Sequence, residues 1–303
     1  MTLVHRKNRI RRTREDVVVD TFVMVMTLLV LIITIYPFWY VVVLSFNDGV
    51  DALRGGIYLW PRKFTLANYQ QFLTDEKWLH AIFVSVGKTV AGTSLTVLFT
   101  CLVAYGLATE RLFFRKFYSI VLLICMYFSG GLIPYYLTLR SYGMLNTFSV
   151  YVIPTMFSTY YCMLAMSFFR EIPPALRESA QLDGARELTI YIRIILPLSK
   201  PLLATLGLFA AVSQWNAWSD TAFYAPSNPD LRSLAFLMRG VIVQNQVDTS
   251  SRAAMMHAAQ YSSVTATSVQ MAAMIIAVLP IMLVYPFLQK HFVKGIMLGA
   301  VKG

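Results

Sequence analysis

Charged residues are scarce in this 303-residue chain, and acidic residues are the scarcest. Asp, Glu, Lys and Arg make up 14% of it, whereas soluble domains contain about 25%. The 15 acidic residues face 26 basic ones, which gives a net charge of +11. Hydrophobic residues account for 57% of the chain. This composition excludes an ordinary soluble domain and indicates an integral membrane protein.

Cysteine and histidine, which often bind metal ions, are also few. The 3 cysteines all lie in apolar runs, and the 4 histidines are scattered without the spacing of a metal site. Neither a disulfide framework nor a bound metal ion is therefore expected. No cofactor is expected on this chain either.

Carboxylates are missing from the central parts of the apolar runs. A proton- or ion-coupled secondary transporter usually needs them there, so that class is the weaker alternative. No arrangement typical of an intramembrane enzyme is present. Gly87, Lys88 and Thr89 resemble the end of a phosphate-binding loop, but the glycine required five residues before Gly87 is replaced by Ile82. We therefore expect no catalytic residues and no ATP hydrolysis by this chain.

Long apolar runs dominate the rest of the sequence. Each is long enough to cross a bilayer as a helix, which takes about 20 residues. They lie at about 21–46, 79–108, 117–138, 149–169, 201–222 and 266–289. The expected fold is an all-α integral membrane domain with six transmembrane helices. Prolines inside the runs predict kinks, and they are Pro37, Pro134, Pro154, Pro280 and Pro286.

Basic residues are concentrated in alternate segments between these runs. Of the 26 Lys and Arg residues, 17 lie in segments on one side and 8 in the longer segments on the other. The richer segments are 1–20, 109–116, 170–200 and 290–303. By the positive-inside rule they lie in the cytoplasm, together with both termini. We interpret the basic N-terminal segment as an anchor attracted to anionic membrane lipid, and expect no nucleic-acid binding.

Residues 178–197 form a polar segment between two apolar runs and read ESAQLDGARELTIYIRIILP. We expect a helix from about residues 173–174 to Leu182, because proline fits the first turn of a helix. Asp183 is expected to cap a second helix, and Gly184 to take a turn conformation. The sequence thus predicts a bent pair of helices.

Small residues at Ser179 and Ala180 are expected to project from the first of these helices and to fit a partner's groove. The second helix is amphipathic, with Arg186 and Glu187 set apart from its apolar face. The alternative is an amphipathic helix that lies on the membrane surface, but that role needs neither the bend nor the small residues.

The order of residues in this segment resembles the cytoplasmic coupling loop of ABC importer permeases, the EAA loop. That loop reads roughly E-A-A-x-x-D-G-A followed by I-x-L-P. The matching positions are Glu178, Ala180, Asp183, Gly184, Ala185, Ile194, Leu196 and Pro197, with Ser179 in place of an alanine. Segments 55–69, 128–134 and 284–303 extend the resemblance over nearly the whole chain. The family it resembles is that of carbohydrate-uptake ABC transporter permeases of the maltose permease (MalG) type, in a subgroup similar to LplC and YtcP.

The resemblance implies a six-span permease domain at 21–289, a cytoplasmic coupling loop at 171–200 and a cytoplasmic tail at 290–303. It implies a second six-span permease, two ABC ATPase subunits that use ATP and Mg²⁺, and an external solute-binding protein. The bacterial cytoplasmic membrane is the expected location. Residues expected to couple to the ATPase are Glu178, Ser179, Ala180, Asp183, Gly184, Ala185 and Arg186.

The resemblance also implies an oligosaccharide or complex glycan as substrate, with a non-sugar solute as the alternative. Aromatic rings and planar polar groups are the side chains that bind sugars. Lys88 lies inside a span, where a charge must face a partner or a cavity, or reach toward the membrane surface. Candidates for the substrate path are Trp215, Asn216, Trp218, Tyr127, Tyr135 and Lys88. Packing between helices is the alternative role of the aromatic residues.

Overall fold

A computed structural model describes residues 14–109, 112–240 and 264–300. Every named element in these ranges is helical, and a single isolated bridge joins Asn47 and Phe64. The N-terminal residues 1–13 and most of the outer stretch 223–265 lie outside the described residues, so the anchor role of the N-terminus stays a prediction.

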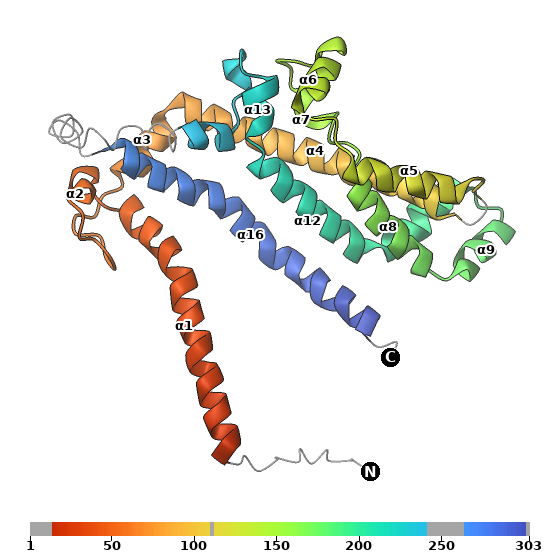
Figure 1. The fold of residues 1–303 in the computed structure, drawn as a ribbon, viewed down its shortest axis with the longest axis horizontal. Helices are drawn as coiled ribbons and strands as arrows, with labels where there is room; N and C mark the ends of the chain where they lie inside the picture. Colours follow the sequence, from red (N-terminus) through yellow and green to blue (C-terminus); the bar gives the residue numbers. More distant parts are fainter. Residues whose placement is uncertain (1–13, 110–111, 241–263, 301–303) are drawn as a thin grey trace.

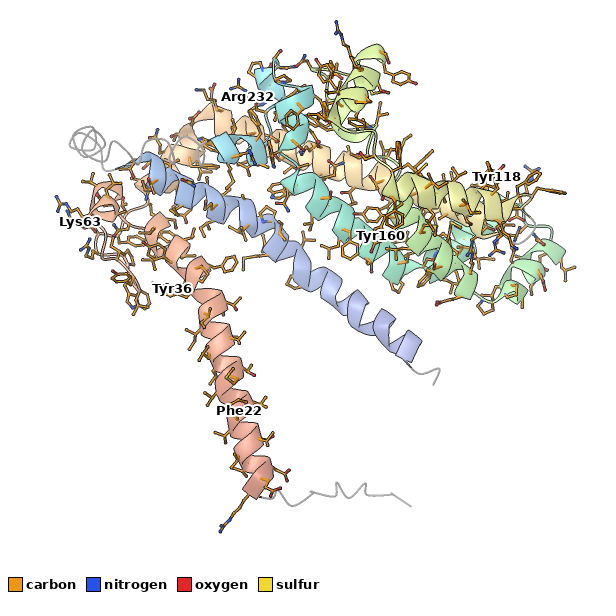
Figure 2. The ribbon with its side chains drawn as sticks, viewed as in Figure 1. Phe22, Tyr36, Lys63, Tyr118, Tyr160 and Arg232 are labelled. Carbon is orange, nitrogen blue, oxygen red and sulfur yellow. The ribbon has the colours of Figure 1, made fainter. Side chains whose placement is uncertain are left out.

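The longest helices are α1 (Arg14–Ser45), α4 (Glu76–Ala108) and α16 (Ala266–Ala300). Figure 1 shows α1 standing away from the bundle, in contact with α16 only near its C-terminal end. Its side chains project to all sides, as Phe22 does in Figure 2. This long apolar surface requires lipid or another protein around it.

The centre of the molecule is formed by α4, α8 (Thr159–Glu171) and α12 (Lys200–Asn216), which pack side by side. Small and medium side chains, such as those of Cys101, Ala104 and Ala165, let the helices approach closely. Figure 1 shows α9 at one end of this bundle and α6, α7 and α13 at the other.

Short helices complete the chain. On the segment after α1 are α2 (Gly49–Leu53) and α3 (Ala67–Thr74). Beyond α4 come α5 (Arg115–Tyr127), α6 (Leu132–Ser141), α7 (Ser149–Val152), α9 (Pro174–Leu182), α10 (Glu187–Ile190), the π-helical turn Tyr191–Ile195 and α11 (Leu196–Leu198). After α12 follow α13 (Ser219–Tyr224) and the 3₁₀ turn η2 (Pro229–Leu231).

Within the described ranges, three helices are long and apolar enough to cross a membrane, and five if each bent pair is one span. One pair is α5 and α6, bent by 111°, and the other is Glu187–Leu198 and α12, bent by 81°. The chain is thus an all-helical membrane protein, while the span count of six stays a prediction.

Several apolar runs are not the continuous helices that were expected. The 117–138 run breaks before α6, where Gly131 takes a positive φ of 86°. Pro134 therefore lies in the first turn of α6 and kinks nothing. The 149–169 run breaks between α7 and α8 at Pro154, which has no N–H to continue the helix. The 201–222 run breaks between α12 and α13.

At the C-terminal end the last helix is longer than the glycines in its sequence suggest. Glycines after Phe292 argue against a stable helix, yet α16 continues to Ala300. Glycine lowers helix stability by only about 1 kcal/mol relative to alanine, so a single glycine does not have to end a helix.

Candidate functional site

The polar segment folds into the expected bend, and backbone hydrogen bonds at the end of α9 hold it. Pro174 opens α9, as predicted. At the other end the N–H of Gly184 donates to the carbonyl of Gln181 at 3.0 Å, and the N–H of Ala185 to that of Ala180 at 2.9 Å. With a φ of 80° at Gly184, this is a Schellman C-cap. The turn role of Gly184 is therefore confirmed.

Asp183 has a different role from the one expected. It is the C-cap residue of α9, while the second helix begins after Arg186 without a side-chain cap. The Schellman motif needs a residue between the helix and the left-handed glycine, and Asp183 occupies that place.

Glu187 fastens the bent pair to the bundle. Its carboxylate accepts hydrogen bonds from Arg177 at 2.6 Å and Gln181 at 2.8 Å, both on α9. Its other oxygen accepts one from the Tyr105 hydroxyl of α4 at 2.9 Å. The Arg177 hydrogen bond lowers the pKa of Glu187, partial burial opposes the shift, and Tyr105 supports it. The sequence analysis missed this role, although an acidic residue ten positions after an arginine across a predicted bend could have suggested it.

Of the two small residues, only Ser179 is exposed. Ala180 has 9% of its surface exposed and packs into the core around α4 and α8, so its expected place on an outward projection is wrong. A helix buries one face, and Ala180 lies on that face of α9. Glu178 and Arg186 are exposed, whereas Ala185 is half-buried.

Apolar side chains are unexpectedly exposed on the same bend. Leu182, at the end of α9, has 90% of its surface exposed, and Leu176 and Leu188 are also exposed. The bend therefore presents apolar side chains beside its charged ones.

Inside the bundle, Lys88 is fully buried, so its amine does not reach toward the membrane surface. Its Nζ donates to the carbonyl oxygen of Ala217, where the chain breaks between α12 and α13. It also lies 5.2 Å from the centre of the Tyr151 ring, a cation–π contact. Lys88 therefore holds the α12–α13 break against α4, and it interacts with the charge of Asp220 without a direct hydrogen bond in the described structure.

Trp215, Asn216 and Trp218 line one cavity of 510 Å³ between α12, α16 and the helical segment 234–240. Trp215 is buried, and its indole N–H donates to the carbonyl of Ala277 on α16 at 2.9 Å. Asn216 is exposed to the cavity. Arg239, which sequence reasoning missed, places its guanidinium 3.5 Å from the centre of the Trp218 ring.

Tyr127 and Tyr135 do not join this group. Tyr127 is exposed at the end of α5, and Tyr135 on α6 packs its ring against Tyr224 at 5.4 Å. Neither lines the cavity beside α12. The structure therefore brings three of the six predicted substrate-path residues together, with Lys88 close to them behind the α12–α13 break.

Comparisons with known proteins agree with this geometry. No protein-family model matches the chain. It is 35% identical to Protein LplC of Bacillus subtilis over 89% of its own length and 90% of that protein. It is 33% identical to the polygalacturonan/rhamnogalacturonan transport system permease protein YtcP of the same organism, over 90% and 94%.

Among solved structures, a chain of a bacterial ABC transporter involved in the import of the acidic polysaccharide alginate has the same fold. The TM-score is 0.83 at 24% identity, covering 93% of this chain and 99% of that one. The match to LplC and YtcP over nearly their full lengths identifies the chain as a member of the carbohydrate-uptake ABC transporter permease family.

Proposed function

We propose that this chain is one of two permease subunits of an ATP-driven importer of oligosaccharides. The observation that carries the proposal is the bent α9–α10 pair. Glu187 holds the two helices together, a Schellman turn ends α9, and exposed leucines lie on the surface of the bend. A rigid, partly apolar bend at the end of a membrane bundle suits docking into a groove of another protein.

The partners follow from this role. ABC ATPase subunits bind the α9–α10 bend in the cytoplasm and use ATP and Mg²⁺ there, while this chain catalyses nothing. A second permease covers apolar surface that the chain leaves exposed, such as that of α1. An external solute-binding protein delivers the substrate at the opposite end. The distribution of basic residues supports cytoplasmic termini in the bacterial plasma membrane.

For the substrate, the relatives favour sugar polymers. YtcP is named for polygalacturonan and rhamnogalacturonan, and the transporter of similar fold imports alginate. Trp215, Asn216 and Trp218 supply rings and an amide at the cavity beside α12, which is the chemistry that sugars need. A non-sugar solute is the alternative, and uptake assays decide it.

The docking role is tested with the Leu182→Asp variant, co-expressed with the second permease, the ATPase subunits and the solute-binding protein. Burying a charge at an apolar interface is unfavourable, so ATPase subunits should no longer co-purify and ATP-driven uptake should be lost. Leu73→Asp, at another exposed leucine that lies on α3 away from the bend, is the control. Full assembly and uptake with Leu182→Asp would refute docking through this bend.

A further inference from the structure

A second cavity, of 490 Å³, lies between α4, α8 and α12 and is polar although the bundle is apolar. Hydroxyl, amide and carboxylate groups line much of it. The polar residues that line it include Thr155, Thr159, Ser213, Gln214 and Asp220. Cavities of about 300–1,000 Å³ are typical of small-molecule sites, so this one can hold one or two sugar residues.

The cavity exists because the chain between α7 and α8 is not helical. Backbone groups there must be satisfied in other ways, and α4 supplies them. The Thr96 hydroxyl bonds the carbonyl of Thr155 at 2.7 Å, and the N–H of Ser158 donates to the hydroxyl of Thr100 at 3.3 Å. Irregular backbone at membrane depth is tolerated only inside protein or along a water-filled cavity. The segment between α7 and α8 is in such a place, because one side of it is hydrogen-bonded to α4 and the other side lines the cavity.

Gln214 forms part of the cavity wall. Its side chain is only 5% exposed, and its amide nitrogen donates to the carbonyl of Tyr151 at 3.2 Å and to the Thr155 hydroxyl at 2.7 Å. The amide oxygen has no hydrogen-bond partner among the described residues. This oxygen is itself buried, so Gln214 shapes the wall of the cavity, and its hydrogen bonds to Tyr151 and Thr155 hold that wall in place.

The groups around Gln214 suit a polyol. Ser213 and Thr159 both donate and accept, Asp220 accepts, and Tyr161 offers an aromatic ring to the C–H face of a sugar. Burial disfavours the charged form of Asp220, and the charge of Lys88, behind Ala217, partly opposes this.

We propose that this hydroxyl-lined cavity is a sugar-binding site on the translocation path, in which Ser213 and Asp220 bind the hydroxyl groups of one sugar residue. The proposal rests on the proposed function, and it assigns sugar contact to residues distinct from the Trp215, Asn216 and Trp218 cavity.

The test uses the assembled transporter in proteoliposomes, with trigalacturonate, an alginate trisaccharide and maltotriose as probes. Ser213→Ala and Asp220→Asn should each raise the apparent KM for uptake about tenfold, equal to about 1.4 kcal/mol for one lost hydrogen bond. Maximal rate per folded complex and binding-protein affinity should stay unchanged, and so should the complex yield of Ser213→Ala, whereas Asp220→Asn also removes the charge that interacts with buried Lys88. Ser167→Ala, on an exposed face of α8 outside the cavity, is the matched control and should keep the native KM.

A second measurement tests directly whether bound sugar shields the cavity. It does not rely on the effect of removing a hydrogen bond. Ser213→Cys, in a Cys125→Ser background, should react with a charged methanethiosulfonate reagent, and the transported sugar should slow the reaction about tenfold. Ser167→Cys should show no protection by sugar.

The possible outcomes separate the two claims. If the native complex takes up none of the probes with ATP, the proposed oligosaccharide import fails, and the sugar site with it. If uptake is normal but both KM values are native, or Ser213→Cys is unreactive because the second permease covers it, only the sugar site is overturned.

Discussion

Gly92 on α4 shows how tightly single residues constrain the bundle. A methyl group at this position would lie 2.5 Å from the amide nitrogen of Gln214, closer than atoms can approach. The Gln214 amide cannot move aside freely, because it is bonded to Tyr151 and Thr155. Glycine is therefore required here for space and not for backbone conformation.

Gly92→Ala should push the Gln214 amide off its partners and destabilise the complex by about 1–3 kcal/mol, the cost of leaving buried polar groups unpaired. Thermal unfolding of the purified complex measures it. Gly207→Ala, in α12 with open space around its Cβ position, should be neutral or slightly stabilising. Equal unfolding temperatures for the two variants would show that Gln214 is not held as described.

Trp215 and Asn216 should respond differently to mutation, since one is buried against α16 and the other faces the cavity. Trp215→Ala removes a large buried side chain, which typically costs about 3–5 kcal/mol, so the yield of folded complex should fall. Asn216→Ala should leave the yield unchanged and lower uptake per folded complex. The ratio of transport to folded complex distinguishes sugar contact from a packing role. A native ratio for Asn216→Ala would mean that Asn216 does not contact the sugar.

At the scale of elements, the α9–α10 bend depends on one left-handed residue, Gly184. A β-branched side chain in that conformation is strained by about 1–2 kcal/mol or more. Gly184→Val should therefore distort the bend, reducing uptake and co-purification of the ATPase while membrane insertion stays intact. Gly184→Asn is the matched control, since asparagine tolerates this conformation. Equal losses for the two variants would mean that the conformation of the turn is not what matters.

The stability of this bend depends on pH through the carboxylate of Glu187. Its pKa lies below the ordinary value of 4.5, so the native state favours the charged carboxylate. Its stabilising effect is complete above the unfolded pKa and is lost as the pH falls through the folded pKa. Proteolysis within 183–187 should therefore increase in Glu187→Gln at neutral pH, and in the native chain only well below pH 4.5. Glu171→Gln, at an exposed glutamate near the same end of the bundle, should match the native pattern at neutral pH.

The sequence predicts the helical class, the long spans and the bend, because those depend on local composition, proline and glycine. It does not predict that Ala180 turns inward or that Glu187 bonds across the bend to Tyr105, because those depend on how α9 meets α4. The polar cavity was also missed. A polar cluster next to a helix-breaking proline within an apolar run could have predicted this cavity: it consists of Thr155, Ser158 and Thr159 beside Pro154.

For the whole molecule, the apolar surface of α1 is left exposed by the rest of the described structure and must be covered by lipid or by another protein. The tail that follows the sixth apolar run is expected to reach the ATPase subunits, by resemblance to maltose-type permeases. Truncation at Lys294 should weaken assembly with the ATPase or the stimulated ATPase activity, measured on purified complex. Native values for both would leave the end of α16 without a role in coupling.

We propose that a separate ATPase docks on the α9–α10 bend. The most direct measurement places a photo-crosslinking amino acid at Leu182 in the assembled transporter and identifies the product by mass spectrometry. We expect a crosslink from Leu182 to the ABC ATPase subunit. The control position Leu73 on α3 should give no crosslink to that subunit. Crosslinks from Leu182 to lipid alone, in a complex that still contains the ATPase and imports sugar, would contradict it.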